Sequence, residues 1–85
     1  YYTYVLQSDR DNRFYIGYTQ DLKKRYKLHL EGHVPATTTR RPVRLIFYEA
    51  YLNRYDALRR ESYLKTSKGK TTLKAMLKDF LGSTP

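Results

Sequence analysis

Two segments that favour β-strands, separated by a short polar stretch, constrain the fold of this chain most strongly. Residues 1–6 and 14–18 are rich in aromatic and β-branched side chains. The polar residues 8–13 between them are typical of a turn. The pattern therefore predicts a β-hairpin at the start of the chain.

The expected loop also sets the register of this hairpin. If residues 9–12 form the loop, Tyr4 lies opposite Gly17 and Leu6 lies opposite Tyr15. All four residues would then share one face of the sheet. A slip of one residue would send the two tyrosines to opposite faces, so the register decides whether they can act together.

Helical and strand patterns alternate after the hairpin. The first expected helix is capped by Thr19 or Asp21 and runs to about 30, before Gly32. A loop over 33–42 and a strand over 43–51 follow. The next helix is capped by Asn53 and runs to about 66, and a last helix ends at Gly82. The chain therefore reads as a single α/β domain over 1–85, with elements in the order β-β-α-β-α-α.

Apolar spacing indicates which helix faces are buried. The first helix should bury Leu22, Tyr26 and Leu30, which are four residues apart. The last helix should be structural, with a complete apolar stripe at positions 73, 76, 77, 80 and 81. A basic turn over 68–70 is expected to precede it.

The charge balance narrows the class of partner. The chain has 17 Lys and Arg against 8 Asp and Glu, a formal net charge of +9, which favours nucleic acid over a merely soluble basic protein. No Cys is present, which excludes a disulfide scaffold and thiolate metal sites. No apolar run approaches the roughly 20 residues that span a bilayer. No signal-peptide pattern begins the chain, so we expect a cytoplasmic protein without membrane contact.

Glu61 stands where the apolar stripe of the second helix should carry a leucine. Ala57, Leu58 and Leu64 flank it on the same side of the helix. A carboxylate in such a stripe costs free energy unless it is paired, protonated or bound to a cation. A pair with Lys65, one turn later, is one account. The other is a hard divalent cation such as Mg²⁺, which takes few protein ligands.

Basic and hydroxyl side chains supply complementary chemistry. Arg25 and His29 are four residues apart and therefore lie on one helix face, where a guanidinium can neutralise phosphate charge and an imidazole can relay a proton. The loop over 33–42 holds three threonines and an arginine pair, which suit phosphate contact, although a solvated connection is an equal alternative. The residues expected to contact a nucleic-acid backbone are Arg40, Arg41, Lys65 and Lys68.

These residues resemble the GIY-YIG nuclease family. The second signature is intact as Tyr15-Ile16-Gly17, and the first appears in degenerate form as Thr3-Tyr4-Val5, with its Tyr offset by one and without Gly or Ile. Arg25, His29 and Glu61 follow in the expected order. The resemblance covers residues 2 to about 70. It is greatest to small stand-alone bacterial members related to the nuclease domain of the nucleotide-excision repair incision subunit.

The resemblance implies a three-stranded antiparallel sheet flanked by helices, with the site around one metal ion. Glu61 would hold a single Mg²⁺ or Mn²⁺. Tyr4 would act as general base or position the attacking water, and Tyr15 would hydrogen-bond the water or the phosphate. Arg25 would clamp the phosphate, and His29 would support the base or the phosphate. Because free Tyr has a pKa near 10, Tyr4 would have to be acidified by the metal or by neighbours such as Arg25 and His29.

The function that the resemblance implies is a metal-dependent DNA endonuclease, with a setting in DNA repair. Single-stranded, duplex and branched DNA all remain open as substrates. Two alternatives remain open as well. One is a nucleic-acid-binding module without catalysis, and the other is a structure-selective or RNA nuclease.

Overall fold

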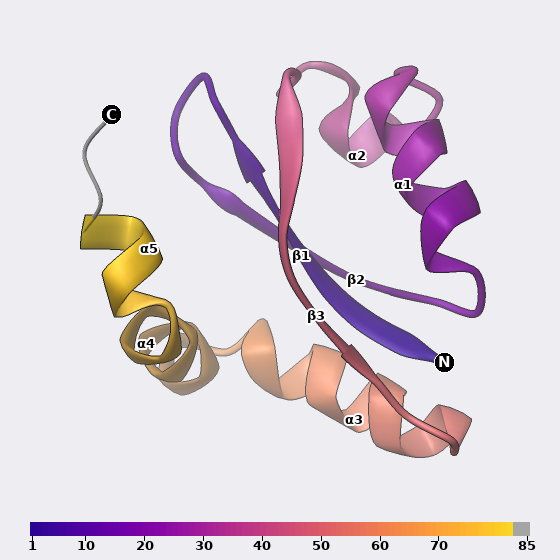
Figure 1. Cartoon of the computed structure of the whole chain (residues 1–85), viewed down its shortest axis with the longest axis vertical. Helices are drawn as coiled ribbons and strands as arrows, with labels where there is room; N and C mark the ends of the chain where they lie inside the picture. Colours follow the sequence, from indigo (N-terminus) through magenta and orange to yellow (C-terminus); the bar gives the residue numbers. More distant parts are fainter. Residues whose placement is uncertain (83–85) are drawn as a thin grey trace.

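Three antiparallel strands form the sheet, and β1 (Tyr2–Ser8) lies between β2 (Phe14–Thr19) and β3 (Val43–Ala50) (Figure 1). The computed structural model describes residues 1–82. The predicted hairpin register is confirmed, because β1 and β2 pair Tyr4 with Gly17 and Leu6 with Tyr15.

Five helices complete the described part of the chain, and their bounds are α1 (Leu22–Leu30), α2 (Pro35–Thr38), α3 (Arg54–Leu64), α4 (Ser67–Met76) and α5 (Lys78–Gly82). Asp21 caps α1 by accepting a hydrogen bond from the Lys24 amide, and Asn53 caps α3 through the Tyr55 amide. Both caps were predicted. None of the helices within residues 1–82 is long and apolar enough to cross a membrane.

The helices cover both faces of the sheet, with α1 and α2 on one side of the strands and α3 and α4 on the other (Figure 1). On the α3 side, Val5 and Ile16 pack against Leu64 and Leu73. On the α1 side, the core is built around Tyr4, Leu6 and Val43, and Leu22 and Tyr26 of α1 pack against it. The predicted antiparallel sheet flanked by helices is therefore confirmed.

Two segments differ from the sequence expectation in detail. The expected loop over 33–42 contains the short helix α2, which begins with Pro35, a residue whose fixed φ suits the first helical turn. The expected basic turn over 68–70 is instead the first turn of α4, because the Thr66 hydroxyl accepts a hydrogen bond from the Gly69 amide and so caps the helix earlier.

The predicted apolar stripes are only partly correct. Leu30 of α1 is 46% exposed, while the neighbouring His29 is fully buried. In the last helical region Leu73 is buried, but Met76, Phe80 and Leu81 are exposed. A break at Leu77 separates α4 from α5 and so interrupts the stripe before Phe80 and Leu81, while Met76 is the last residue of α4.

Candidate active site

Gly17 allows the ring of Tyr4 to lie flat across β2. A Cβ atom at position 17 would overlap the ring and the hydroxyl group of Tyr4, so any other residue there would displace this side chain. Tyr4 is only 1% exposed. The glycine of the intact signature therefore has a direct structural reason, since it creates the space in which the Tyr4 phenol is held.

A chain of hydrogen bonds holds the Tyr4 hydroxyl. Its oxygen lies 2.9 Å from Nε2 of His29, and Nδ1 of His29 lies 2.7 Å from the Thr37 hydroxyl. That hydroxyl donates to the Val34 carbonyl at 3.5 Å, so it accepts the proton on Nδ1. Nε2 is then left with a lone pair, to which the Tyr4 hydroxyl donates. Sequence analysis missed Thr37, because a threonine in an expected loop carries no sign of this contact.

Tyr15 completes an aromatic cluster on the same face. Its ring centroid lies 5.2 Å from that of His29 and 6.4 Å from that of Tyr4. The hairpin register brings the two tyrosines together, and His29 of α1 packs against them. The structure thus brings together three of the residues that the resemblance singled out.

Arg25 lies one turn before His29 on α1 and is partly buried. Its guanidinium lies against the hydroxyls of Tyr4 and Tyr15, and these contacts raise the pKa of Arg25. Its Nε atom is buried with no hydrogen-bond partner in the described part of the chain. A buried donor without a partner is costly, so a shift of the Arg25 side chain that brought this atom to an acceptor would be favourable.

Glu61 is carried by α3, which packs against β1 and β2 on the face of the sheet opposite α1. Its charge contributes to raising the pKa of Tyr4, so the carboxylate lies within electrostatic reach of that phenol. The side chain is 19% exposed, and Oε2 lies 3.3 Å from Nζ of Lys65. The alternative partner considered from the sequence is therefore present. Because Lys65 is 56% exposed, this pair contributes little stability and does not bar a competing cation.

The pKa values show both central groups to be neutral in the protein. Burial raises the pKa of Tyr4, and neighbouring Tyr15 and Glu61 add to the rise, while Arg25 opposes it. Burial, followed by the charge of Arg25, lowers the pKa of His29 to about 4. Arg25 and His29 therefore do not acidify Tyr4 by themselves, because desolvation outweighs the guanidinium.

The low pKa of His29 predicts a loss of stability in acid. The unfolded chain binds a proton at its ordinary pKa of about 6.5, whereas the folded chain resists protonation down to about 4. Stability is thus fully present above pH 6.5 and falls as the pH drops towards 4, by up to about 3 kcal/mol from this residue. Urea unfolding of the wild type and of His29→Gln at pH 7 and pH 5 measures the difference. His33→Gln is the matched control, because His33 is exposed.

An equally steep decline in His29→Gln would show that other groups cause the acid sensitivity. A flatter decline in His29→Gln than in His33→Gln is the expected result.

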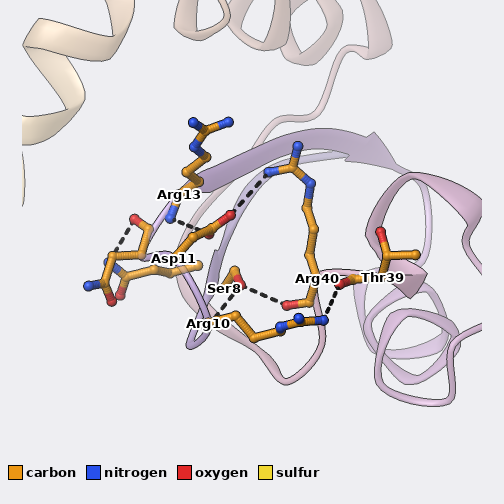
Figure 2. Close-up of polar contacts among 8 residues, drawn as sticks. Ser8, Arg10, Asp11, Arg13, Thr39 and Arg40 are labelled. Atoms are coloured by element: carbon orange, nitrogen blue, oxygen red, sulfur yellow. Dashed lines mark hydrogen bonds and ion pairs between the residues drawn. The ribbon is translucent and has the colours of Figure 1, made fainter.

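Arg40, the first residue of the arginine pair in the 33–42 segment, is anchored to the end of β1 and the loop that follows it (Figure 2). The Ser8 hydroxyl donates to the Arg40 carbonyl at 2.7 Å, and Figure 2 shows the Arg40 guanidinium directed towards Asp11, 3.8 Å away. Arg41 donates from Nε to the Thr38 carbonyl at 3.2 Å. Both side chains therefore help hold the segment in place. The Arg40 contacts could not be predicted, since they join residues about thirty positions apart, whereas the Arg41 contact is local.

The remaining basic residues of the predicted set lie on α3 and α4. Lys65 pairs with Glu61, as described, and Lys68 is exposed in the first turn of α4. The structure therefore does not gather Arg40, Arg41, Lys65 and Lys68 into one cluster with the aromatic residues.

The carboxylate chemistry fits a cation that takes few protein ligands. Within residues 1–82, no group of three or more His, Cys, Asp or Glu side chains could enclose a metal ion. Mg²⁺ needs no such cage, because it keeps several waters and binds one or two carboxylates together with substrate phosphates. Glu61, mostly shielded and within electrostatic reach of Tyr4, is the carboxylate that fits this description.

Comparisons with known proteins agree with this geometry. The family model described as the GIY-YIG catalytic domain matches residues 1–74. The chain is 42% identical to the UPF0213 protein YazA of Bacillus subtilis (strain 168), over 76% of this chain and 66% of that protein. It is 35% identical to a UPF0213 protein of Pediococcus pentosaceus, over 99% of this chain and 88% of that protein. No solved structure matches significantly.

The matched region contains every element that forms the aromatic cluster and also the helix that carries Glu61. The family supports a nuclease-like function on nucleic acid, and its nucleases are generally metal-dependent. The chain belongs to the GIY-YIG family.

Proposed function

We propose that this chain is a metal-dependent DNA endonuclease that hydrolyses phosphodiester bonds. The observation that carries the proposal is the Arg25 guanidinium, which lies against the hydroxyls of Tyr4 and Tyr15 next to the Tyr4–His29 pair. A guanidinium in this position suits a nucleic-acid phosphate, which it can bind through several N–H donors. Cleavage of labelled DNA that requires Mg²⁺ or Mn²⁺ and stops on addition of EDTA tests the proposal.

Glu61 would hold the single Mg²⁺ or Mn²⁺ ion, because it is the shielded carboxylate near Tyr4. When bound, the cation supplies a Lewis acid that stabilises negative charge on the phosphate and the leaving oxygen. Lys65 would leave Glu61 and turn towards the nucleic-acid backbone, which its exposed position permits.

The other residues would bind and orient the scissile phosphate and the attacking water. Arg25 would clamp the scissile phosphate and stabilise the charge that develops as water attacks the phosphorus. Tyr4 would hold the attacking water or take its proton, and its raised pKa favours the holding role in the free protein. His29 keeps the Tyr4 hydroxyl in one orientation through the 2.9 Å hydrogen bond. Tyr15, on the same face, would hydrogen-bond the water or the phosphate.

A second candidate is a nucleic-acid-binding module without catalysis. The Glu61–Lys65 pair is the observation that favours it, since Glu61 already has a partner other than a metal ion. An RNA or structure-selective nuclease would use the same phosphate contacts, because these contacts carry no base information. We place the activity in the cytoplasm and, by analogy with the repair nuclease domain, in DNA repair.

The arginine pair provides a test of the nucleic-acid path. Replacing Arg40 and Arg41 with Ala should weaken binding of every DNA sequence alike, because backbone contacts are not sequence-specific. The log–log salt dependence should flatten by about 0.7 to 0.9 for each lost phosphate contact. Affinity measured across a salt series gives this slope. Turnover at saturating DNA should change little, since neither residue lies in the aromatic cluster.

Loss of the Asp11 and Thr38 contacts could also loosen the loop, so thermal unfolding of the double variant is the control. A double variant that folds normally and binds DNA normally at every salt concentration would show that the segment is only a connection. The DNA would then follow the exposed lysines of α1 (Lys23, Lys24 and Lys27) or those of α4 (Lys68 and Lys70).

A further inference from the structure

A tyrosine-lined pocket of about 440 Å³ lies next to the aromatic cluster, between the start of α1 and residues of β1 and β3. Tyr2, Tyr26 and Tyr48 form its aromatic walls, and Lys23 lies among its lining residues. The volume is within the range of pockets that bind small organic groups. Neither the aromatic cluster nor the proposed cleavage reaction uses this pocket.

Strand pairing explains why two of the tyrosines meet. β1 and β3 pair Tyr4 with Tyr48 and Tyr2 with Ala50, so Tyr2 and Tyr48 lie diagonally opposite on one face. Their ring centroids are 6.1 Å apart in an edge-to-face arrangement. Tyr26 reaches the same space from α1.

These aromatic groups are accessible to a ligand. Tyr48 is 54% exposed, and the hydroxyls of Tyr2, Tyr26 and Tyr48 make no hydrogen bond within residues 1–82. Elsewhere among the described residues the Tyr4, Tyr51 and Tyr63 hydroxyls have partners, whereas the Tyr18 hydroxyl, outside this pocket, also has none. Three phenols that face one pocket without partners can offer both flat faces and hydrogen bonds to a planar polar group.

The row of paired residues fixes where the pocket lies relative to the proposed reaction. Gly17, Tyr4 and Tyr48 are successive partners across the three strands. Neighbouring strands are about 4.8 Å apart, so position 48 lies about 10 Å from position 17. Tyr4 leans towards Gly17, which leaves the space over β3 open. A nucleotide next to the scissile phosphate could therefore reach the pocket.

We propose that the pocket binds an unpaired nucleobase of the DNA strand whose phosphate lies at Arg25. The base would stack on the tyrosine rings, as bases do in proteins that bind single strands, and Lys23 would contact the adjoining phosphate. Asp21 also lines the pocket, but its carboxylate is engaged by the Lys24 amide as the cap of α1. A base that remains paired inside a duplex cannot enter. The inference deepens the proposed function, on which it rests, by assigning single-stranded or branched DNA as substrate.

The test measures binding without cleavage. Affinity for a short single-stranded DNA and for a blunt duplex of the same sequence is measured in EDTA, with the wild type and three variants. Tyr48→Ala should weaken single-strand binding about 5- to 150-fold and leave duplex binding within about 2-fold. Tyr48→Phe keeps the ring and should retain most of the affinity. Tyr55→Ala is the matched control, because Tyr55 is 62% exposed and does not line the pocket.

A probe inside the strand reports stacking directly. Fluorescence of 2-aminopurine, placed next to the phosphate that is cleaved, should be quenched by the wild type and by Tyr48→Phe, but not by Tyr48→Ala. Equal single-strand affinity of Tyr48→Ala and wild type would overturn the proposal, as would an equal loss in Tyr55→Ala. So would a wild-type dimer that Tyr48→Ala dissociates without any change in DNA affinity, since the pocket would then be an interface between copies.

The outcome is separate from that of the cleavage assay. Tyr48-dependent single-strand binding by a protein that cleaves no DNA supports the pocket and refutes only the endonuclease. Cleavage of DNA by a protein whose single-strand binding does not depend on Tyr48 refutes only the pocket.

Discussion

Replacing Glu61 with Gln is expected to abolish metal-dependent cleavage while leaving the fold intact. The amide keeps the shape of the side chain but removes the charge that a divalent cation needs. Loss of a metal that stabilises the transition state costs several kcal/mol, which corresponds to about a 10³-fold slower reaction or more. Single-turnover cleavage rates across a series of Mg²⁺ and Mn²⁺ concentrations measure the effect, and circular dichroism checks the fold.

Glu49 provides a matched control for this substitution. Its carboxylate is 25% exposed and accepts a hydrogen bond from Arg60 at 2.9 Å, so it is a second shielded, paired carboxylate. Glu49→Gln should lower stability without slowing cleavage. If Glu61→Gln cleaves as fast as the wild type, the pair with Lys65 is the better account of Glu61.

Tyr4→Phe is expected to slow the chemical step about 10²- to 10⁴-fold and to change DNA affinity little. Only the phenol oxygen is lost, together with its 2.9 Å hydrogen bond to His29, and the ring can still lie over Gly17. The separation of rate from affinity is measured by single-turnover kinetics at saturating DNA and by equilibrium binding in EDTA.

Tyr63→Phe is the control for the loss of a phenol. The Tyr63 hydroxyl also makes a 2.9 Å hydrogen bond, to Thr72, but on the α3 side of the sheet. Equal losses of rate in Tyr4→Phe and Tyr63→Phe would mean that the effect is one of stability. An unchanged rate in Tyr4→Phe would remove Tyr4 from the reaction altogether.

Local patterns explain why much of the fold was predictable. The hairpin follows from a short polar stretch between two segments that favour strands. The length of its loop determines that Tyr4 lies opposite Gly17. Asp21 and Asn53 cap their helices by contacts with residues two or three positions away. Glu61 could be singled out because a carboxylate interrupts an apolar stripe, which is again a local signal.

Contacts between distant segments were not predictable. His29 is buried in place of Leu30 because both of its ring nitrogens have partners, and Thr37 comes from a segment read as a loop. The tyrosine-lined pocket depends on the pairing of β1 with β3. That register shifts between Val5 and Leu6, where β3 carries an extra residue, and no sequence pattern predicts the shift.

The central claim is that DNA is hydrolysed at the site formed by Tyr4, Arg25 and Glu61 with a divalent cation. The most direct measurement incubates labelled single-stranded, duplex and branched DNA with Mg²⁺, with the wild type and Glu61→Gln prepared in parallel, and then repeats the reactions in EDTA. We expect the wild type to cleave at least one substrate with Mg²⁺, and neither EDTA-treated wild type nor Glu61→Gln to do so. Cleavage that persists in EDTA or in Glu61→Gln, or no cleavage of any substrate with Mg²⁺ or Mn²⁺, would contradict the account.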